Sequence, residues 1–260
     1  MNPIELKVER LSAGYRNRPV ICDITLPPIR AGEITALVGP NAAGKSTLLR
    51  ALAGLLPAQG RALFGEKSIL ELSPAARAEL IGFMPQSVPQ AAGLTVFEGL
   101  LTALHLARSS NRNHFMEKAT DVLSRLGIAE IALEPMHRLS GGQRQLASLA
   151  QSIVSEPLLL MLDEPTSALD LRHQFEVMNI VRDYVRKGRI AVVVLHDLTF
   201  AARWADNVII MEKGNLKSAG PPAVAITPEM LASVYGVDCR VERCSCGFLQ
   251  VVVDRLSKHR

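Results

Sequence analysis

The chain has 260 residues and a mass of 28.2 kDa, a length that allows one large domain or two small ones. With 48% apolar and 21% charged residues, its composition excludes disordered, collagen-like and coiled-coil chains. The net charge is +4 with the basic residues scattered, and only 4% of the residues are aromatic. We therefore expect no nucleic acid as a partner.

The first part of the chain alternates strand and helix patterns around a glycine-rich loop. Residues 4–9 and 33–38 read as strands, and residues 46–56 carry leucines at helical spacing. The loop and the first residues of the helix read Gly39-Pro40-Asn41-Ala42-Ala43-Gly44-Lys45-Ser46-Thr47. This is the G-x4-G-K-[ST] pattern of a P-loop, in its confirming position between a strand and a helix. Backbone N–H groups and the helix N-terminus bind phosphates, Lys45 adds a mobile charge, and Ser46 offers a hydroxyl to Mg²⁺.

The middle of the chain reads as mostly helical. After a short strand at residues 81–84, helical patterns cover residues 95–107, 115–126 and 141–154. The chain returns to an apolar strand at residues 158–162. We therefore interpret residues 87–156 as a helical subdomain inserted into a nucleotide-binding core of residues 1–86 and 157–260. Alternating strands and helices indicate an α/β fold with a largely parallel sheet.

A second candidate phosphate site precedes the last helix of this block. Leu139 is followed by Ser140, Gly141, Gly142 and Gln143. Serine is a good N-cap, and a Ser-Gly-Gly sequence at a helix N-terminus predicts an anion site. A capped helix after a glycine turn is the alternative on local grounds, but the full string favours the anion site.

The apolar strand at residues 158–162 ends in two carboxylates, Asp163 and Glu164. Ligands of an open α/β sheet bind at the carboxyl ends of its strands, so this position suits a functional pair. Asp163 is a suitable ligand for Mg²⁺, and Glu164 is then free to orient or deprotonate an attacking water. An ordinary acidic pair at a strand end is the alternative, and the P-loop makes it the weaker one.

The last third predicts a helix over residues 171–186, strands at residues 190–195 and 208–211, and a helix that starts at residues 227–229. We expect no signal peptide and no membrane-spanning segment, because the longest apolar stretch is far shorter than about 20 residues. The cysteines Cys22, Cys239, Cys244 and Cys246 lack the paired spacing of a zinc site. We expect a cytoplasmic chain with reduced thiols, and the role of the last three cysteines stays open.

Together these motifs resemble the ATPase subunit of an ATP-binding-cassette (ABC) transporter over nearly the whole chain. The resemblance implies that Tyr15 stacks on adenine, that Gln86 reaches Mg²⁺ and the attacking water, and that His196 contacts the γ-phosphate. It also implies that Ser167 and Asp170 belong to a loop that crosses a dimer interface. The implied fold is a P-loop core with a mixed, largely parallel sheet, an antiparallel β part and the helical subdomain.

The resemblance further implies a mechanism and partners. Two chains form a head-to-tail homodimer, in which the Lys45 loop of one chain and the Ser140 helix end of the other sandwich ATP. Integral membrane permease subunits bind the dimer at the cytoplasmic face of the membrane, and a substrate-binding protein takes part indirectly. We expect the segment of residues 86–101 to face the permease.

A weaker similarity covers the C-terminal half. Residues 166–174 and 194–198 resemble the ATPases of importers for iron–siderophore complexes, haem and vitamin B12. The alternatives are an ABC ATPase for another import substrate, a soluble non-transport ABC ATPase, or a binding-only cassette, although Glu164 and His196 favour turnover. One departure is Ala42, where the family commonly has glycine. A left-handed backbone there costs about 1 kcal/mol, and a right-handed one costs nothing.

Overall fold

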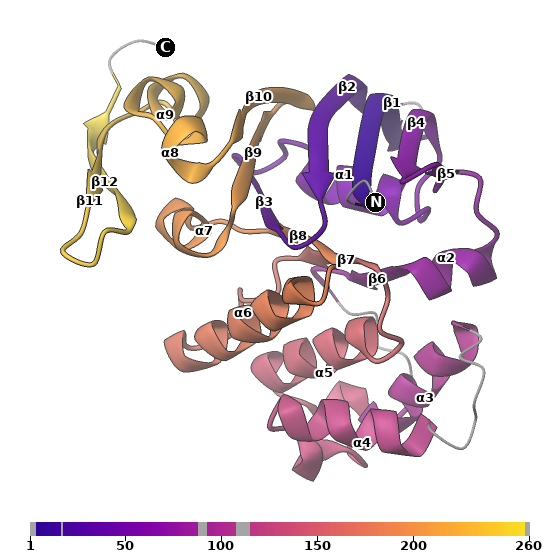
Figure 1. Cartoon of the computed structure of the whole chain (residues 1–260). Helices are drawn as coiled ribbons and strands as arrows, with labels where there is room; N and C mark the ends of the chain where they lie inside the picture. The colour runs from indigo at the N-terminus through magenta and orange to yellow at the C-terminus, as the bar shows by residue number, and fades with distance from the viewer. Residues whose placement is uncertain (1–3, 17, 88–92, 108–114, 258–260) are drawn as a thin grey trace. The chain divides into compact units, whose positions relative to one another are not determined.

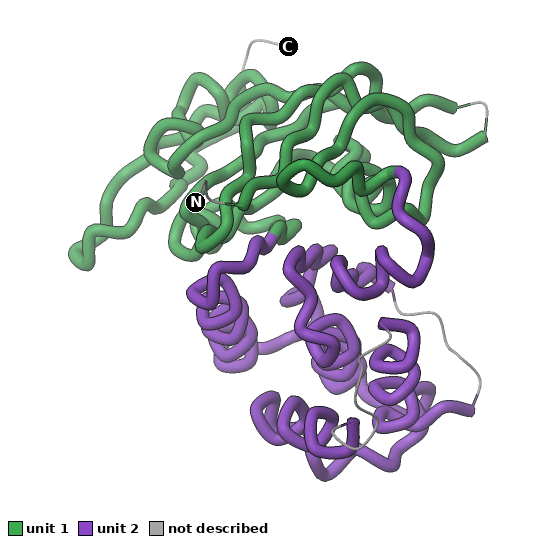
Figure 2. The backbone as a smooth tube through the Cα atoms, turned by 45° about the vertical axis from the view of Figure 1, so that its right-hand side comes forward, with its two compact units in different colours: residues 1–70, 192–260 green, residues 71–191 purple. Residues whose placement is uncertain are grey.

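The computed structural model describes residues 4–16, 18–87, 93–107 and 115–257. The chain divides into two compact units, unit 1 with residues 1–70 and 192–260 and unit 2 with residues 71–191 (Figure 2). Among the described residues, no helix is long and apolar enough to cross a membrane.

Unit 1 contains an antiparallel sheet with the strand order β2-β1-β4-β5 (Figure 1). Its strands are β1 (Glu5–Tyr15), β2 (Arg18–Arg30), β4 (Ala58–Phe64) and β5 (Lys67–Ser68). Along β1 every second side chain is buried over the first four residues, so Leu6 and Val8 point into the core. Val8 lies opposite Leu26 of β2, and this register gives the sheet one apolar face. The antiparallel β part that the resemblance implied is confirmed.

A second group of strands in unit 1 carries the glycine-rich loop. β3 (Ile34–Val38) pairs in parallel with β9 (Asn207–Glu212), and β10 (Asn215–Gly220) pairs antiparallel with β9. All five residues of β3 are buried, as expected for a continuously apolar strand. The helix α1 (Lys45–Leu52) follows the loop. The mixed character expected for this sheet is confirmed.

The C-terminal part of unit 1 consists of short helices and a hairpin. The helices are α7 (Leu198–Trp204), α8 (Pro222–Ala225) and α9 (Pro228–Tyr235). Thr227 caps α9 by accepting a hydrogen bond from the Met230 N–H, so the predicted helix start is confirmed. After α9 the chain forms an antiparallel hairpin of β11 (Val237–Arg243) and β12 (Leu249–Leu256).

Unit 2 combines two parallel strands with most of the helices. β6 (Ile81–Met84) pairs in parallel with β7 (Leu159–Asp163), with Met84 opposite Leu162. The helices are α2 (Pro74–Leu80), α3 (Val96–Leu106), α4 (Phe115–Arg125), α5 (Gly141–Ile153) and α6 (Leu171–Arg186). The strand β8 (Ile190–Val194) follows α6. The predicted helix over residues 171–186 is confirmed to the residue.

The end of one helix and the limits of the compact units differ from what the sequence predicts. The helix expected over residues 46–56 ends at Leu52, because Gly54 adopts a left-handed backbone (φ 68°) and its N–H bonds the Ala51 carbonyl. The compact units divide the chain after residues 70 and 191, whereas the expected subdomain runs from residue 87 to 156. The subdomain boundaries stay a prediction.

Candidate functional site

The glycine-rich loop of unit 1 turns sharply between β3 and α1. Gly39, Ala42 and Gly44 all have left-handed backbones, with φ of 149°, 62° and 101°. A Cβ on Gly39 would lie 2.1 Å from the Met211 carbonyl oxygen, so only glycine fits there. Gly44 is the N-cap of α1, so no side chain caps this helix at the loop. This is the arrangement that binds phosphate at a helix N-terminus.

Lys45 is held over this loop. Its side chain is 6% exposed, and Nζ donates to the carbonyl oxygens of Gly39 (2.7 Å) and Pro40 (2.9 Å). Lys45 therefore fixes the first half of the loop and at the same time brings its positive charge to it. A phosphate bound in the loop would lie beside this charge.

Two contacts support the loop from other elements of unit 1. The Gly214 N–H, in the turn after β9, donates to the Ala43 carbonyl at 2.9 Å. The Gly39 N–H donates to the phenolic oxygen of Tyr235, the last residue of α9. Burial raises the pKa of Tyr235 to about 12, and the bond from Gly39 acts in the opposite direction. Neither Gly214 nor Tyr235 could be found from the sequence, because nothing local marks them as neighbours of the loop.

Unit 1 also holds Tyr15 and His196. Tyr15 is 43% exposed, its hydroxyl accepts a 3.0 Å bond from Arg50 Nη1 of α1, and it lines an open cavity of about 1050 Å³. His196 is exposed and comes directly after Leu195, whose N–H donates to the Leu37 carbonyl of β3 at 3.2 Å. His196 therefore comes at the end of β3 from which the glycine-rich loop departs. The remaining loop positions, Asn41, Ser46 and Thr47, continue this half of the candidate site.

Unit 2 brings together the acidic pair and Gln86. Asp163 ends β7 with 0% exposure, and Glu164 follows with 9%. Because β6 and β7 are parallel with Met84 opposite Leu162, Gln86 and Glu164 leave the sheet at the same end. The fully buried carboxylate of Asp163 and the side-chain amide of Gln86 both follow this end of the sheet. Their oxygen atoms are a donor set of the kind that Mg²⁺ binds.

Glu164 is locked in an unusual conformation. Its φ is 58°, a left-handed value that is costly for a residue with a side chain. Its carbonyl oxygen accepts hydrogen bonds from Gln145 Nε2 (2.6 Å) and Ser167 Oγ (3.2 Å). Gln145 Oε1 in turn accepts from the Ala168 N–H at 2.9 Å. Gln145, which the sequence analysis did not single out, therefore connects α5 to Glu164 and to the loop that follows it.

The Ser-Gly-Gly segment forms the capped N-terminus of α5. Ser140 Oγ accepts from the Gln143 N–H at 3.3 Å, and Gln143 Oε1 accepts from the Ser140 N–H at 3.0 Å. A Cβ on Gly142 would approach Leu169 Cδ2 to 3.3 Å, whereas Gly141 is exposed. The predicted N-cap is confirmed, and the exposed Gly141 leaves the helix end open to an anion.

Ser167 and Asp170 lie on the exposed loop between Glu164 and α6. Asp170 caps α6, since its carboxylate accepts from the His173 N–H (2.9 Å) and contacts His173 Nδ1 (2.8 Å). Both bonds lower the pKa of Asp170, and the bond from the His173 backbone has the larger effect. The loop is thus fixed at both ends, by Gln145 at its start and by the α6 cap at its finish.

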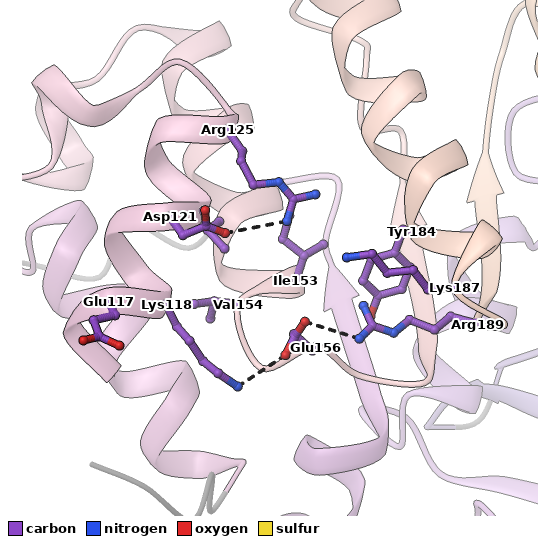
Figure 3. A pocket seen from close by; sticks show the side chains of 11 residues that line it. Glu117, Lys118, Asp121, Arg125, Ile153, Val154, Glu156, Tyr184, Lys187 and Arg189 are labelled. Atoms are coloured by element: carbon purple, nitrogen blue, oxygen red, sulfur yellow. Dashed lines mark hydrogen bonds and ion pairs between the residues drawn. The ribbon is translucent and has the colours of Figure 1, made fainter. Parts of the chain in front are cut away.

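A cavity of about 270 Å³ in unit 2 is lined by residues of α4, the end of α5 and the end of α6 (Figure 3). None of the predicted site residues lines it. In Figure 3, Glu156 points between Lys118 and Arg189, which it contacts at 3.3 and 3.4 Å. Burial raises the pKa of Glu156, but the bonds from Lys118 and Arg189 outweigh it and bring the pKa below the ordinary value. This ion-pair cluster ties α4 to the connection between α5 and β7.

Comparison with known proteins gives consistent matches. The sequence model of the family described as ABC transporter matches residues 23–167. The chain is 36% identical over 244 residues to the hemin import ATP-binding protein HmuV of Pseudomonas aeruginosa, covering 92% of this chain and 95% of that protein. It is 33% identical to the iron(3+)-hydroxamate import ATP-binding protein FhuC of Bacillus subtilis, covering 91% and 89%.

Among solved structures, an inward-facing conformation of an ABC transporter assigned to the metal-chelate type has a similar chain. The TM-score is 0.78 at 27% identity, and the match covers 98% of each chain. The family match spans more than half of this sequence, and both relatives exceed 30% identity over nine-tenths of it. The chain therefore belongs to the ABC transporter family of ATPases.

Proposed function

We propose that this chain is the ATP-hydrolysing subunit of an importer, and that it powers the uptake of an iron chelate, either a siderophore complex or haem, or of cobalamin. The observation that carries the ATPase part is the loop between β3 and α1, with Lys45 fixed across it by its bonds to Gly39 and Pro40. The names of the hemin and iron-hydroxamate import proteins, which resemble this chain over nine-tenths of its length, support the cargo class.

The proposed roles follow the chemistry of each side chain. The loop N–H groups and Lys45 bind the β- and γ-phosphates of ATP, and Tyr15 stacks on the adenine. Glu164 orients or deprotonates the attacking water, and hydrogen bonds from Gln145 and Ser167 to its carbonyl hold its strained backbone in place. His196 contacts the γ-phosphate. These assignments rest on motif order together with the local geometry of each unit.

Mg²⁺ is the implied metal. Ser46, Gln86 and Asp163 would hold it with oxygen atoms, the ligand type that Mg²⁺ prefers. When bound, the ion would offset negative charge on the phosphates. The buried Asp163 carboxylate at the end of β7 fits this role, because a charge so fully removed from water is stabilised by a cation.

We also propose that the working unit is a homodimer on membrane permease subunits, at the cytoplasmic face of the membrane. The capped, exposed N-terminus of α5, with Ser140, Gly141 and Gly142, would bind the γ-phosphate of the ATP held by the other chain. ATP then stabilises the closed dimer, and loss of the γ-phosphate lets it open. Residues 86–101 are the proposed permease contact. Residues 88–92 of that segment lie outside the described part of the chain.

Growth of a deletion strain tests the cargo and the direction together. The strain is grown on ferric siderophores, haem or free iron as the iron source, and in a cobalamin-dependent condition. A defect on one chelate supports import of that chelate. The defect should be corrected by the parent gene and by Lys67→Ala, which changes an exposed lysine of β5. Lys45→Ala should fail to correct it.

Two results would redirect the proposal. Normal growth in every condition, with ATP hydrolysis by the permease complex intact, would move the cargo to another import substrate. Full ATPase activity of the purified chain, with no permease recovered alongside it, would favour a soluble ABC ATPase. Nucleotide binding by Lys45→Ala as tight as by the parent would reject the role given to the loop.

A further inference from the structure

The tip of the β11–β12 hairpin carries two closely spaced thiols that the ATPase function does not use. Cys244 and Cys246 flank one residue of a tight turn, in which the Cys244 N–H donates to the Phe248 carbonyl (2.9 Å). The Gly247 N–H donates back to the Cys244 carbonyl (2.8 Å), with Gly247 in a left-handed conformation. Both cysteines are free thiols, Cys246 is exposed and Cys244 is partly exposed.

The surroundings of Cys244 favour its thiolate form. The largest effect on the pKa of this thiol is a hydrogen bond from the backbone of Cys246, which lowers it. Burial is the next effect and raises the pKa, but the backbone of Phe248 and the charge of Arg203 lower it further, so the pKa ends below the ordinary value. Arg203 is fixed on α7 with its guanidinium 4.6 Å from the centre of the Phe248 ring.

A second cation adds to the positive field of the turn. Arg243 Nη1 donates to the Gly247 carbonyl at 2.7 Å. Cys239, on the same hairpin, contrasts with Cys244, since burial and the nearby Asp254 raise the pKa of its thiol. The turn therefore combines one activated thiol, one exposed thiol and two guanidinium groups.

We propose that Cys244 is a modification site, at which a small disulfide bearing carboxylates reacts by thiol–disulfide exchange and Cys246 resolves the product. The Cys244 thiolate attacks one sulfur of the small disulfide, forms a mixed disulfide and releases one thiolate. Cys246, after losing its proton to solvent, attacks Cys244 Sγ and releases the second thiolate. The protein dithiol is oxidised by two electrons, and the small disulfide is reduced to two thiols.

The geometry of the turn permits the second step. Disulfides bridge Cα atoms about 4.4–6.8 Å apart, and two residues span at most roughly 7 Å even in a fully extended chain. The turn that the Cys244 and Gly247 bonds close shortens this span into the range of a disulfide. The carboxylates of the small disulfide would meet Arg203 and Arg243, which selects anionic reagents over neutral ones.

The modified tip belongs to an element that packs on α7. The Val251 N–H of β12 donates to Thr199 Oγ of that helix at 3.1 Å, and Arg203 of α7 contacts the tip. Asp197, directly after His196, caps the start of α7. The tip is thus in contact with the helix that begins next to His196. The modification itself does not depend on the proposed transport function.

The test treats the purified full chain with oxidised glutathione at pH 7 and follows each cysteine by peptide mass spectrometry. We expect Cys244 to react about threefold or more faster than Cys22, which is exposed on β2 and serves as the internal reference. The parent should end as a Cys244–Cys246 disulfide without retained glutathione. Cys246→Ser should instead retain one glutathione on Cys244.

Charge reversal of the reagent and removal of the cation complete the test. Arg203→Gln should slow the reaction of Cys244 severalfold and leave Cys22 unchanged, and cystamine, a cationic disulfide, should lose the preference for Cys244. The proposal is overturned if Cys244 reacts no faster than Cys22 in the parent. It is also overturned if Cys246→Ser, folded as judged by its melting temperature, retains no glutathione on Cys244.

Discussion

At the scale of single residues, Ala42 stands out because its backbone is left-handed and its side chain is exposed. The flanking left-handed positions of the loop, Gly39 and Gly44, carry no Cβ. The left-handed region costs an L-residue with a Cβ roughly 1–2 kcal/mol. Of the two alternatives that the sequence left open, the structure has the costly one, so the loop stores strain where phosphate is expected to bind.

Ala42→Gly should relieve this strain. We expect a gain in the free energy of unfolding of about 0.5–1 kcal/mol, because the added freedom of glycine in the unfolded chain offsets part of the gain. Thermal unfolding checks this against Ala76→Gly, the same change within the right-handed helix α2, which should lose about 0.5–1 kcal/mol. Equal losses in both variants would show that Ala42 carries no strain.

The glycine-rich loop and its place between a strand and a helix could be predicted because the motif is local and lies within residues 39–47. Gln145 and Tyr235 could not. Gln145 bonds the carbonyl of Glu164, 19 residues away, and Tyr235 meets Gly39 across nearly 200 residues. A glutamine inside a helix pattern or an aromatic residue at a helix end has many possible partners. Only the folded chain decides which one it contacts.

At the scale of elements, α5 carries both a candidate phosphate site at its first turn and the Gln145 bonds one turn later. Gln145 is 7% exposed, and its amide satisfies one acceptor on Glu164 and one donor on Ala168. A movement of α5 therefore changes the support of Glu164 directly. This makes Gln145 a positioning residue within unit 2.

Gln145→Leu should separate positioning from binding. It leaves the Glu164 carbonyl and the Ala168 N–H without these partners, so stability should fall by about 1–3 kcal/mol. ATP turnover should fall at least tenfold while ATP affinity stays within about twofold, because Gln145 does not belong to the loop proposed to bind phosphate. Steady-state kinetics and nucleotide binding measure the two effects. Gln145→Glu, which keeps the acceptor for Ala168, should recover part of the turnover.

Gln250→Leu, at an exposed position of β12, is the matched control and should leave turnover unchanged. If Gln145→Leu weakened ATP binding and turnover in equal proportion, the residue would act on the phosphate loop instead. An unchanged turnover would remove any role for the connection between α5 and Glu164.

The ion pairs of Glu156 give a pH-dependent link between α4 and the connection that precedes β7. The folded-state pKa of Glu156 lies below the 4.5 of a free glutamate. The stability it contributes is therefore fully present above about pH 4.5 and is lost as the pH falls through the folded-state pKa. Its side chain is 49% exposed, so solvent screening keeps this contribution small.

Glu156→Gln should lower the free energy of unfolding by about 0.5–1 kcal/mol at pH 7, because Lys118 and Arg189 lose their partner. The deficit should shrink at 1 M salt and vanish as the pH falls through the folded-state pKa of Glu156. Denaturant unfolding across this pH range measures it, with Glu130→Gln on an exposed site as control. A deficit that persists at low pH would assign the loss to packing and not to charge.

Helix periodicity predicted α3 to α6 well, because each buries an apolar stripe that the sequence displays. β2 was missed for a physical reason, since Pro27 and Pro28 argue against a strand interior. The strand order β2-β1-β4-β5 has β2 at the edge, where proline is tolerated. The helices α2 and α7 have seven residues each, too short for a period to emerge.

At the scale of the whole molecule, the chain carries two candidate phosphate sites at helix N-termini, one in each compact unit. The first belongs to α1 and the loop that Lys45 crosses, and the second is the exposed start of α5. The N-terminus of a helix carries a partial positive charge, and an anion stabilises it. The proposed dimer uses both on one ATP, so nucleotide state should control association of two chains.

Glu164→Gln tests this association most directly. The substitution preserves size and hydrogen-bonding shape, so the loop that Gln145 and Ser167 hold should keep its conformation. Loss of the base should lower turnover by about a hundredfold or more while ATP still binds. An ATP-bound dimer should then accumulate, measurable by light scattering with ATP and absent with ADP.

Two controls accompany this variant. Lys45→Ala combined with Glu164→Gln should stay monomeric, and Glu66→Gln, at an exposed turn residue, should behave as the parent. Turnover by Glu164→Gln at the parent rate would show that another group activates the water, and a monomer with ATP bound would contradict the shared site.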